Sequence, residues 1–336
     1  MRIVLCYPVE ERHVRQLSAA APGQKIVNAG PERIADEILS ADVFLGHAKV
    51  PVPWDDVVRR GRLKWIQSSA AGLDHCLVPS VIASDIVVTS ASGLFADPVA
   101  EQTLALLLGL LRGLPTFFRA QQQREFVRRP TRDLHDMKIG IVGLGGNGRR
   151  LAEVLAPFRP RILATDYFPI DKPENVAELW PHTELAALLS QVDVVILCVP
   201  LNEQTTGLID ARAFGQMKRG AVLINVARGP VVVERDLVAA LQSGQISAAG
   251  LDVTEVEPLP ASSPLWDMPN VLITPHVGAQ SERRADVTTD FLANNLRRYV
   301  SGEPLQNVVD KKLGFPRRVS VNAAKATNTT NSRAGS

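Results

Sequence analysis

Between Lys138 and Asp166 the chain runs through an apolar stretch, a glycine-rich turn, a helix-forming stretch, a second apolar stretch and an acid. The turn is Gly-x-Gly-x-x-Gly at Gly143, Gly145 and Gly148, and Asp166 follows the first glycine by 23 positions (166 minus 143). This order predicts a strand, a phosphate-binding turn, a helix and an acid at the end of a second strand. Parallel α/β sheets bind a dinucleotide with that arrangement.

Each residue type in this motif has a physical role. Gly143 permits the tight turn, Gly145 lets the backbone approach a pyrophosphate, and Gly148 lets the helix pack closely on the sheet. The phosphate charge then faces the helix N-terminus. Asp166 is suited to accept hydrogen bonds from the ribose hydroxyls and to repel a 2′-phosphate, and no arginine follows it at 167–169, so NAD is predicted and NADP is less favoured. The alternative is a turn that binds nothing.

Composition narrows the class of protein. A chain of 336 residues is long enough for two domains, and its net charge of +2 gives no electrostatic case for nucleic acid. The cysteines Cys6, Cys76 and Cys198 are odd in number and have no Cys-x-x-Cys spacing, which predicts neither a disulfide framework nor a metal site. No apolar run approaches the length of a membrane span. We therefore expect a cytoplasmic protein that contacts no membrane.

The position of the fingerprint predicts the domain organisation. A dinucleotide fingerprint normally opens its domain, yet here about 140 residues precede it, so another α/β domain is expected first. We predict two Rossmann-like, doubly wound parallel-sheet domains, the first of them a discontinuous, flavodoxin-like substrate domain. The expected boundaries are 1–99 plus 295–314 for the substrate domain, 100–294 for the NAD-binding domain and 315–336 for a disordered tail.

Reactive residues follow the strand candidates of the second domain. These residues are Asp166, Pro200, Arg228, Asp252 and His276. Because ligands of open parallel sheets lie beyond the carboxyl ends of the strands, these residues are expected at one edge with the cofactor. Arg228 can fork two hydrogen bonds to a carboxylate, and His276 can give and take a proton near neutral pH.

Glu257, in the loop after Asp252, is placed to hydrogen-bond His276 and to stabilise its protonated form. Together with Arg228 it completes an Arg, Glu and His constellation for reduction of a ketone. The alternatives are structural: a surface arginine, a histidine in a turn and an exposed loop acid.

Several longer motifs occur in a recognisable order. They are SSAAGLDHC, GLFADPVAEQTLALLL, VGLGGNGRRLA, INVARGPVVVERDLVAAL, GLDVTEVEPLP, ITPHVGAQS and GEPLQNVVD. Across about residues 40 to 314 the chain thereby resembles the D-isomer-specific 2-hydroxyacid dehydrogenases. The resemblance implies that Arg228 anchors the substrate, that Glu257 tunes the histidine, and that His276 exchanges a proton with the 2-oxygen while hydride passes between C2 and the nicotinamide.

The resemblance also implies the remaining contacts. Ala71 and Gly72 would offer backbone N–H groups to the substrate carboxylate. The implied cofactor contacts are Thr103, Gly143, Gly145, Gly146, Asn147, Gly148, Asp166, Cys198, Val199, Pro200, Val226, Ala227, Asp252, His276 and Gly278. Two positions depart from the family: Asn147 stands where Ile or Val is usual, and Gln102 where many members have His or Leu.

The expected activity is NAD-dependent interconversion of a small D-2-hydroxy acid and its 2-keto acid, of the glyoxylate or hydroxypyruvate type, by a homodimer. One alternative is a D-3-phosphoglycerate dehydrogenase without a regulatory domain, for which Lys49, Arg59, Arg60, Arg62 and Lys64 are candidate phosphate ligands. The other is an NAD(H)-sensing protein similar to the corepressors of this family. A tyrosine-based short-chain reductase is excluded because no Tyr-x-x-x-Lys occurs.

Overall fold

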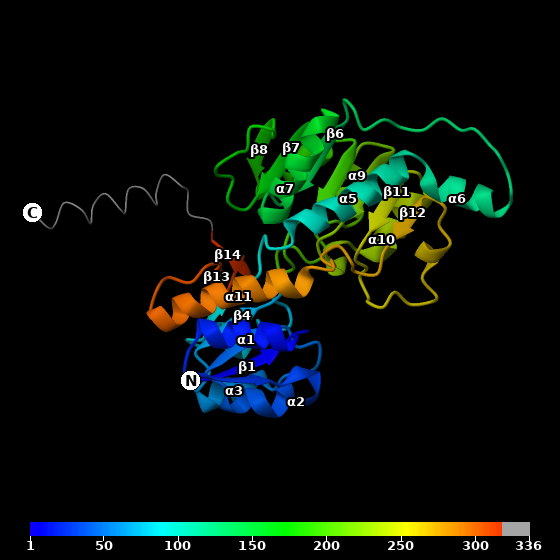
Figure 1. Ribbon diagram of the computed structural model, residues 1–336. Helices are drawn as coiled ribbons and strands as arrows, with labels where there is room; N and C mark the ends of the chain where they lie inside the picture. Colours follow the sequence, from blue (N-terminus) through cyan, green and yellow to red (C-terminus); the bar gives the residue numbers. More distant parts are fainter. Residues whose placement is uncertain (318–336) are drawn as a thin grey trace, which may run out of the picture. The chain divides into compact units, whose positions relative to one another are not determined.

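Parallel strands alternate with helices along the chain in the computed structural model, which describes residues 1–317 (Figure 1). The strands form two large sheets, one of five strands and one of seven, each in its own compact unit. Unit 1 contains 1–99, 200–205 and 277–316, and unit 2 contains 100–199 and 206–276. The predicted fold class, two doubly wound parallel-sheet domains with the first one discontinuous, is confirmed.

The sheet of unit 1 has the order β2-β1-β3-β4-β5, with every neighbouring pair parallel. This is the flavodoxin-like order. Its elements are β1 (Arg2–Cys6), α1 (Glu11–Ala20), β2 (Lys25–Asn28), α2 (Gly30–Glu37), η1 (Ile38–Ser40), β3 (Val43–Gly46), α3 (Trp54–Arg60), β4 (Trp65–Ser68), α4 (Pro79–Ala83) and β5 (Val87–Thr89).

Two hydrophobic cores cover the two faces of this sheet because alternate strand residues point to opposite sides. Ile3 and Leu5 of β1 face α1, whereas Val4 and Cys6 face the core that contains Ile34 of α2. Figure 1 shows α1 on one side of the sheet and α2 and α3 on the other. Strands buried on both faces read as apolar runs, as IVLC of β1 and VFLG of β3 do.

The end of the chain returns to unit 1 through α11 (Arg284–Ser301), β13 (Val309–Asp310) and β14 (Phe315–Pro316). The whole of α11 belongs to unit 1, so this unit begins again at Val277 and not at the expected residue 295. The reason is packing: the α11 side chains buried in the core with α1 are Leu292, Ala293 and Leu296. Residues 315 and 316, expected in the tail, pair with β13, and the rest of that expected tail, from residue 318, lies outside the described residues.

The sheet of unit 2 has the order β12-β11-β10-β9-β6-β7-β8, again with all neighbours parallel. Six strands follow the Rossmann order and β12 adds a seventh. The elements are α5 (Ala96–Leu111, which begins in unit 1), α6 (Leu114–Gln122), β6 (Lys138–Val142), α7 (Gly146–Leu155), η2 (Ala156–Phe158), β7 (Arg161–Asp166), β8 (Glu178–Pro181), η3 (His182–Glu184), α8 (Leu185–Leu189), β9 (Val194–Leu197), α9 (Ala211–Gln216), β10 (Ala221–Asn225), η4 (Gly229–Val231), α10 (Glu234–Gln242), β11 (Ile246–Leu251), η5 (Pro264–Trp266) and β12 (Val271–Ile273).

Helix α5 is apolar because it is buried against this sheet. Leu106, Leu107 and Leu111 are at most 3% exposed and share a core with Ile139 and Ile141 of β6. Within residues 1–317 no single helix is long and apolar enough to cross a membrane; α5 and α6 pass that test only as a pair, with a 67° bend between them.

Candidate active site

The glycine-rich turn joins β6 to α7 at the carboxyl edge of the unit 2 sheet. Gly143 has φ +96°, and a Cβ there would lie 2.9 Å from the Cys198 carbonyl. A Cβ on Gly148 would lie 2.2 Å from the Gly143 oxygen, so both positions require glycine. A Cβ on Gly145 would meet nothing within 4 Å. The helix N-terminus therefore has free space beside it, as binding of a pyrophosphate requires.

Asp166 ends β7 next to this turn. Its Oδ2 accepts a hydrogen bond from the Leu144 amide at 2.6 Å, and its Oδ1 accepts one from the Phe168 amide at 2.9 Å. Each carboxylate oxygen has a second lone pair. The carboxylate is thus held in place and can still accept hydrogen bonds from two ribose hydroxyls.

Arg149, which the sequence analysis did not single out, fastens the turn to the loop after β7. Its guanidinium donates to the carbonyl oxygens of Leu144 (3.2 Å), Ile170 (2.9 Å) and Asp171 (2.6 Å). The next cation of this loop, Lys172, donates to the Val176 oxygen at 2.6 Å. Arg149 and Lys172 are thus both engaged by main-chain carbonyls. In the sequence, the only indication of a role for Arg149 is its position directly after Gly148.

Cys198 follows β9 and forms the wall beneath Gly143, and its amide donates to the Val142 oxygen at 2.8 Å. Burial raises the pKa of the Cys198 thiol to about 12. The thiol is therefore protonated at neutral pH and acts here as a small apolar group.

Arg228 lies in the turn after β10, half-buried. One of its guanidinium nitrogens donates to the Ala227 oxygen at 2.7 Å. The turn is braced by Asn225, whose Oδ1 accepts from the Ala227 amide at 3.0 Å and whose Nδ2 donates to the Arg228 oxygen at 3.1 Å. A Cβ on Gly229 would lie 1.7 Å from the Thr254 oxygen, so this turn presses against the loop that carries Glu257.

Glu257 and His276 form the pair expected from the sequence, with 2.8 Å between Glu257 Oε2 and His276 Nδ1. Because an ionised carboxylate can only accept, Nδ1 carries the hydrogen and Nε2 is the nitrogen available to a ligand. The side chains are 40% and 45% exposed, respectively, so a ligand can reach them. The other carboxylate oxygen, Oε1, accepts from the Thr254 amide at 3.3 Å.

His276 has φ +53°, an unusual conformation for a residue with a side chain. Its amide donates to the oxygens of Asp252 (2.8 Å) and Thr274 (3.0 Å), and these bonds hold the strained backbone.

A second hydrogen-bonded chain runs behind the histidine. Asp252 is 3% exposed, and its Oδ1 accepts from the Thr274 hydroxyl at 2.7 Å. The Gln102 amide in turn donates to that hydroxyl at 2.9 Å. Gln102 is one of the two departures from the family, and Thr274 was missed because its contacts join distant parts of the chain. Thr103, which follows Gln102 on α5, is fully buried.

The other expected site residues are divided between the two units. Gly146 and Asn147 open α7, and Val226 and Ala227 occupy the turn before Arg228, all in unit 2 together with Val199. In unit 1 lie Ala71, Gly72, Pro200 and Gly278.

The Ala71–Gly72 segment belongs to the loop after β4. Ser68 shapes the start of this loop, because its hydroxyl accepts from the Ala70 amide at 3.0 Å. Within residues 1–317 neither the Ala71 nor the Gly72 amide donates to another group of the protein. These two N–H groups are available to an anion.

In the described part of the chain, no three His, Cys, Asp or Glu side chains are grouped so that they could hold a metal ion.

Residues 104–278 match the family "D-isomer specific 2-hydroxyacid dehydrogenase, NAD binding domain". Glyoxylate reductase of Thermofilum pendens is 35% identical over 262 residues, 75% of this chain and 76% of that protein. D-3-phosphoglycerate dehydrogenase of Methanocaldococcus jannaschii is 29% identical over 92% of this chain but only 59% of that longer protein.

Two solved structures are similar over most of their length. A D-isomer specific 2-hydroxyacid dehydrogenase from Xanthobacter autotrophicus, in complex with NADPH and MES, gives a TM-score of 0.80 at 32% identity and covers 93% of this chain and 99% of that one. An NADPH-dependent glyoxylate/hydroxypyruvate reductase from Sinorhizobium meliloti, in complex with NADP and sulfate, gives a TM-score of 0.80 at 28% identity. The match covers 94% of this chain and 99% of that one.

Proposed function

This chain belongs to the D-isomer-specific 2-hydroxyacid dehydrogenase family, and we propose that it reduces a small 2-keto acid of the glyoxylate or hydroxypyruvate type with NADH. The family makes it an oxidoreductase that acts on CH–OH donors with a nicotinamide cofactor. The observation that carries the proposal is the Glu257–His276 hydrogen bond of 2.8 Å in the loop that contacts the turn of Arg228.

The cofactor, when bound, supplies the hydride. Arg228 forks hydrogen bonds to the carboxylate and keto oxygens of the substrate, and the Ala71 and Gly72 amides bind the carboxylate. His276 donates the proton from Nε2 to the 2-oxygen as that oxygen becomes a hydroxyl. Glu257 accepts from Nδ1 and favours the protonated ring, so the proton donor is ready before hydride arrives.

We propose NAD(H) as the cofactor, although the two similar structures described above contain NADPH or NADP. Asp166 supports NAD because its carboxylate is held at the end of β7, beside the glycine-rich turn, where a negative charge would repel a 2′-phosphate. Arg149 and Lys172 support it too, since each is bound to main-chain oxygens.

The substrate is proposed to lack a phosphate. Three of the five candidate phosphate ligands in unit 1 are engaged within that unit. Arg59 pairs with Asp56, Arg62 pairs with Asp42 at 3.1 Å, and Lys64 donates to the Gly61 oxygen at 2.9 Å. The charges of the two arginines are therefore partly neutralised, and the lysine already donates a hydrogen bond. These interactions disfavour 3-phosphoglycerate as the substrate.

The test is NADH oxidation by the purified protein with glyoxylate, hydroxypyruvate, pyruvate and 3-phosphohydroxypyruvate offered separately, each repeated with NADPH. Turnover of glyoxylate or hydroxypyruvate with NADH is the expected result. Preference for the phosphorylated acid would contradict the substrate proposal, and tight NADH binding without turnover of any acid would favour an NAD(H)-sensing role.

A further inference from the structure

A buried asparagine holds the turn that carries Arg228. Asn225 is the last residue of β10 and is 1% exposed. Its two polar atoms bind the main chain of two consecutive residues, the Ala227 amide at 3.0 Å and the Arg228 oxygen at 3.1 Å. One side chain therefore spans the turn and sets the direction in which Arg228 leaves the backbone.

The main chain of Asn225 also supports the strand that leads to the histidine. The Asp252 amide donates to the Asn225 oxygen at 3.0 Å, and the His276 amide donates to the Asp252 oxygen at 2.8 Å. Asn225 is thus connected to Arg228 through its side chain and to His276 through two main-chain hydrogen bonds.

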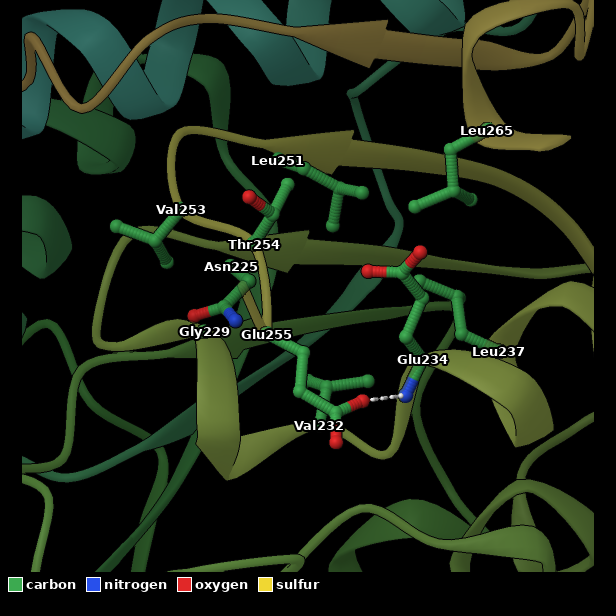
Figure 2. Close-up of a pocket in the computed structure, with 10 residues that line it drawn as sticks. All are labelled: Asn225, Gly229, Val232, Glu234, Leu237, Leu251, Val253, Thr254, Glu255 and Leu265. Atoms are coloured by element: carbon green, nitrogen blue, oxygen red, sulfur yellow. Dashed lines mark hydrogen bonds between the residues drawn. The ribbon is translucent and has the colours of Figure 1, made fainter. Parts of the chain in front are cut away.

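A contact made by Gly229, directly after Arg228, joins the Arg228 turn to the loop that carries Glu257. The Gly229 Cα packs on the Thr254 carbonyl so closely that a Cβ would reach 1.7 Å, and the Thr254 amide donates to Glu257. Figure 2 shows Asn225, Gly229 and Thr254 around one small pocket, beside the hydrogen bond from the Glu234 amide to Glu255.

We propose that Asn225 is a positioning residue that orients the Arg228 guanidinium toward the substrate. The inference rests on the proposed function, in which Arg228 forks hydrogen bonds to a 2-keto acid. A forked contact depends on orientation, because a small misplacement costs much of the interaction. An aspartate at 225 keeps the acceptor for the Ala227 amide but sets an oxygen against the Arg228 oxygen. The turn must then shift to relieve that contact.

The first measurement compares Asn225→Asp with wild type in steady-state reduction of whichever of glyoxylate and hydroxypyruvate the wild type turns over. We expect kcat/KM to fall at least about tenfold, mainly through KM, because the buried Nδ2 donor is replaced by an oxygen that repels the Arg228 carbonyl oxygen. NADH affinity, measured by fluorescence, should fall less than kcat/KM does, because Asp166 and the glycine-rich turn are unchanged. The matched control is Asn270→Asp in the same unit. The Asn270 side-chain Nδ2 also donates to a main-chain oxygen, that of Ser247 at 2.9 Å, but at an exposed site.

A double-mutant cycle separates positioning from general stability. If Asn225 acts through Arg228, then Asn225→Asp added to Arg228→Ala should cost less than about twofold more. Losses that multiply would overturn the proposal, as would an Asn225→Asp enzyme with unchanged KM. Should Asn225→Asp fail to fold, the same cycle with Asn225→Ser gives the same two readings.

The proposed function is tested separately, by turnover of the wild-type protein, whereas the positioning role of Asn225 is tested only by the variants. Absence of that turnover would overturn the function and this inference together.

Discussion

At the scale of single residues, the clearest feature is that each charged group of the site is held by main-chain groups. Asp166 is held by two amides and Arg149 by three carbonyls, whereas Glu257 shares its carboxylate between the Thr254 amide and His276. Main-chain partners are rigid, so the direction of each side chain is fixed before a ligand binds.

The Asp166 carboxylate makes a direct prediction about cofactor choice. Asp166→Ala should weaken NADH about tenfold, since two charge-assisted ribose hydrogen bonds are lost, and should weaken NADPH less or not at all. Fluorescence titration with both cofactors measures the two dissociation constants. Glu174→Ala, an exposed acid on the same loop, is the control. An equal loss for both cofactors would mean that Asp166 does not face the ribose.

Glu257 makes a prediction about the rate of reduction. Glu257→Gln keeps an acceptor for the His276 ring but removes the negative charge beside the proton donor, so kcat of reduction should fall at least about tenfold. Glu255→Gln, whose carboxylate binds the Glu234 amide at 2.7 Å, should leave kcat within about twofold of wild type. A kcat of Glu257→Gln equal to that of wild type would rule out the proposed role.

At the scale of elements, Asp193 joins the beginnings of β6 and β9. Its Oδ2 accepts from the Lys138 amide and its Oδ1 from Lys218 Nζ, both at 2.9 Å. Burial acts to raise the pKa of Asp193, but these hydrogen bonds outweigh it and hold the pKa below the usual value. A carboxylate with a lowered pKa stabilises the folded state above its ordinary pKa and loses that contribution as pH falls through the folded value.

Asp193→Ala should accordingly lower the free energy of unfolding by about 1–2 kcal/mol at pH 7, the usual effect of losing such hydrogen bonds. The difference from wild type should shrink as pH falls below about 4. Urea unfolding at pH 7 and pH 3 provides the comparison, with the exposed Asp267→Ala as control. A difference that is as large at pH 3 as at pH 7 would show that the charge is not involved.

The sequence predicted strands in both sheets but missed β2 and β8, two of the four strands at sheet edges. Strands β6, β10 and β12 contain apolar runs that the sequence analysis identified as strands. The edge strands β2 and β8 are four residues long and partly exposed, so neither apolar alternation nor an apolar run marks them. The start of α11 in unit 1 was missed for a similar reason, because only packing against α1 assigns it.

The same distinction holds within the site. Arg228, Asp252 and His276 could be predicted because each closely follows a recognisable strand. Asn225 and Thr274 could not, because what matters is which backbone group or side chain the fold brings to them.

At the scale of the whole molecule, exposed apolar side chains on α6 and the segment after it point to self-association. Phe118, Phe126 and Val127 are 55%, 94% and 43% exposed. Exposed apolar side chains can mark a protein interface, and we propose a homodimer that buries these three.

Sedimentation of the purified protein should give twice the mass of one chain, and Phe126→Glu should shift it toward one chain at micromolar concentration. Phe158→Glu, at another exposed phenylalanine, should leave the mass unchanged. A single-chain mass for wild type would contradict the dimer.

The chain passes from unit 2 to unit 1 directly after His276, so Arg228, Glu257 and His276 all belong to one unit, and Ala71 and Gly72 to the other. In the proposed function, the proton-transfer residues and Arg228 thus belong to unit 2, and the two amides proposed to bind the carboxylate belong to unit 1. Such a molecule is modular: mutations in the loops of unit 1 can alter which acid is accepted while the proton-transfer residues stay as they are. Chimeras that exchange those loops between relatives would inherit the chemistry from one parent and the selectivity from the other.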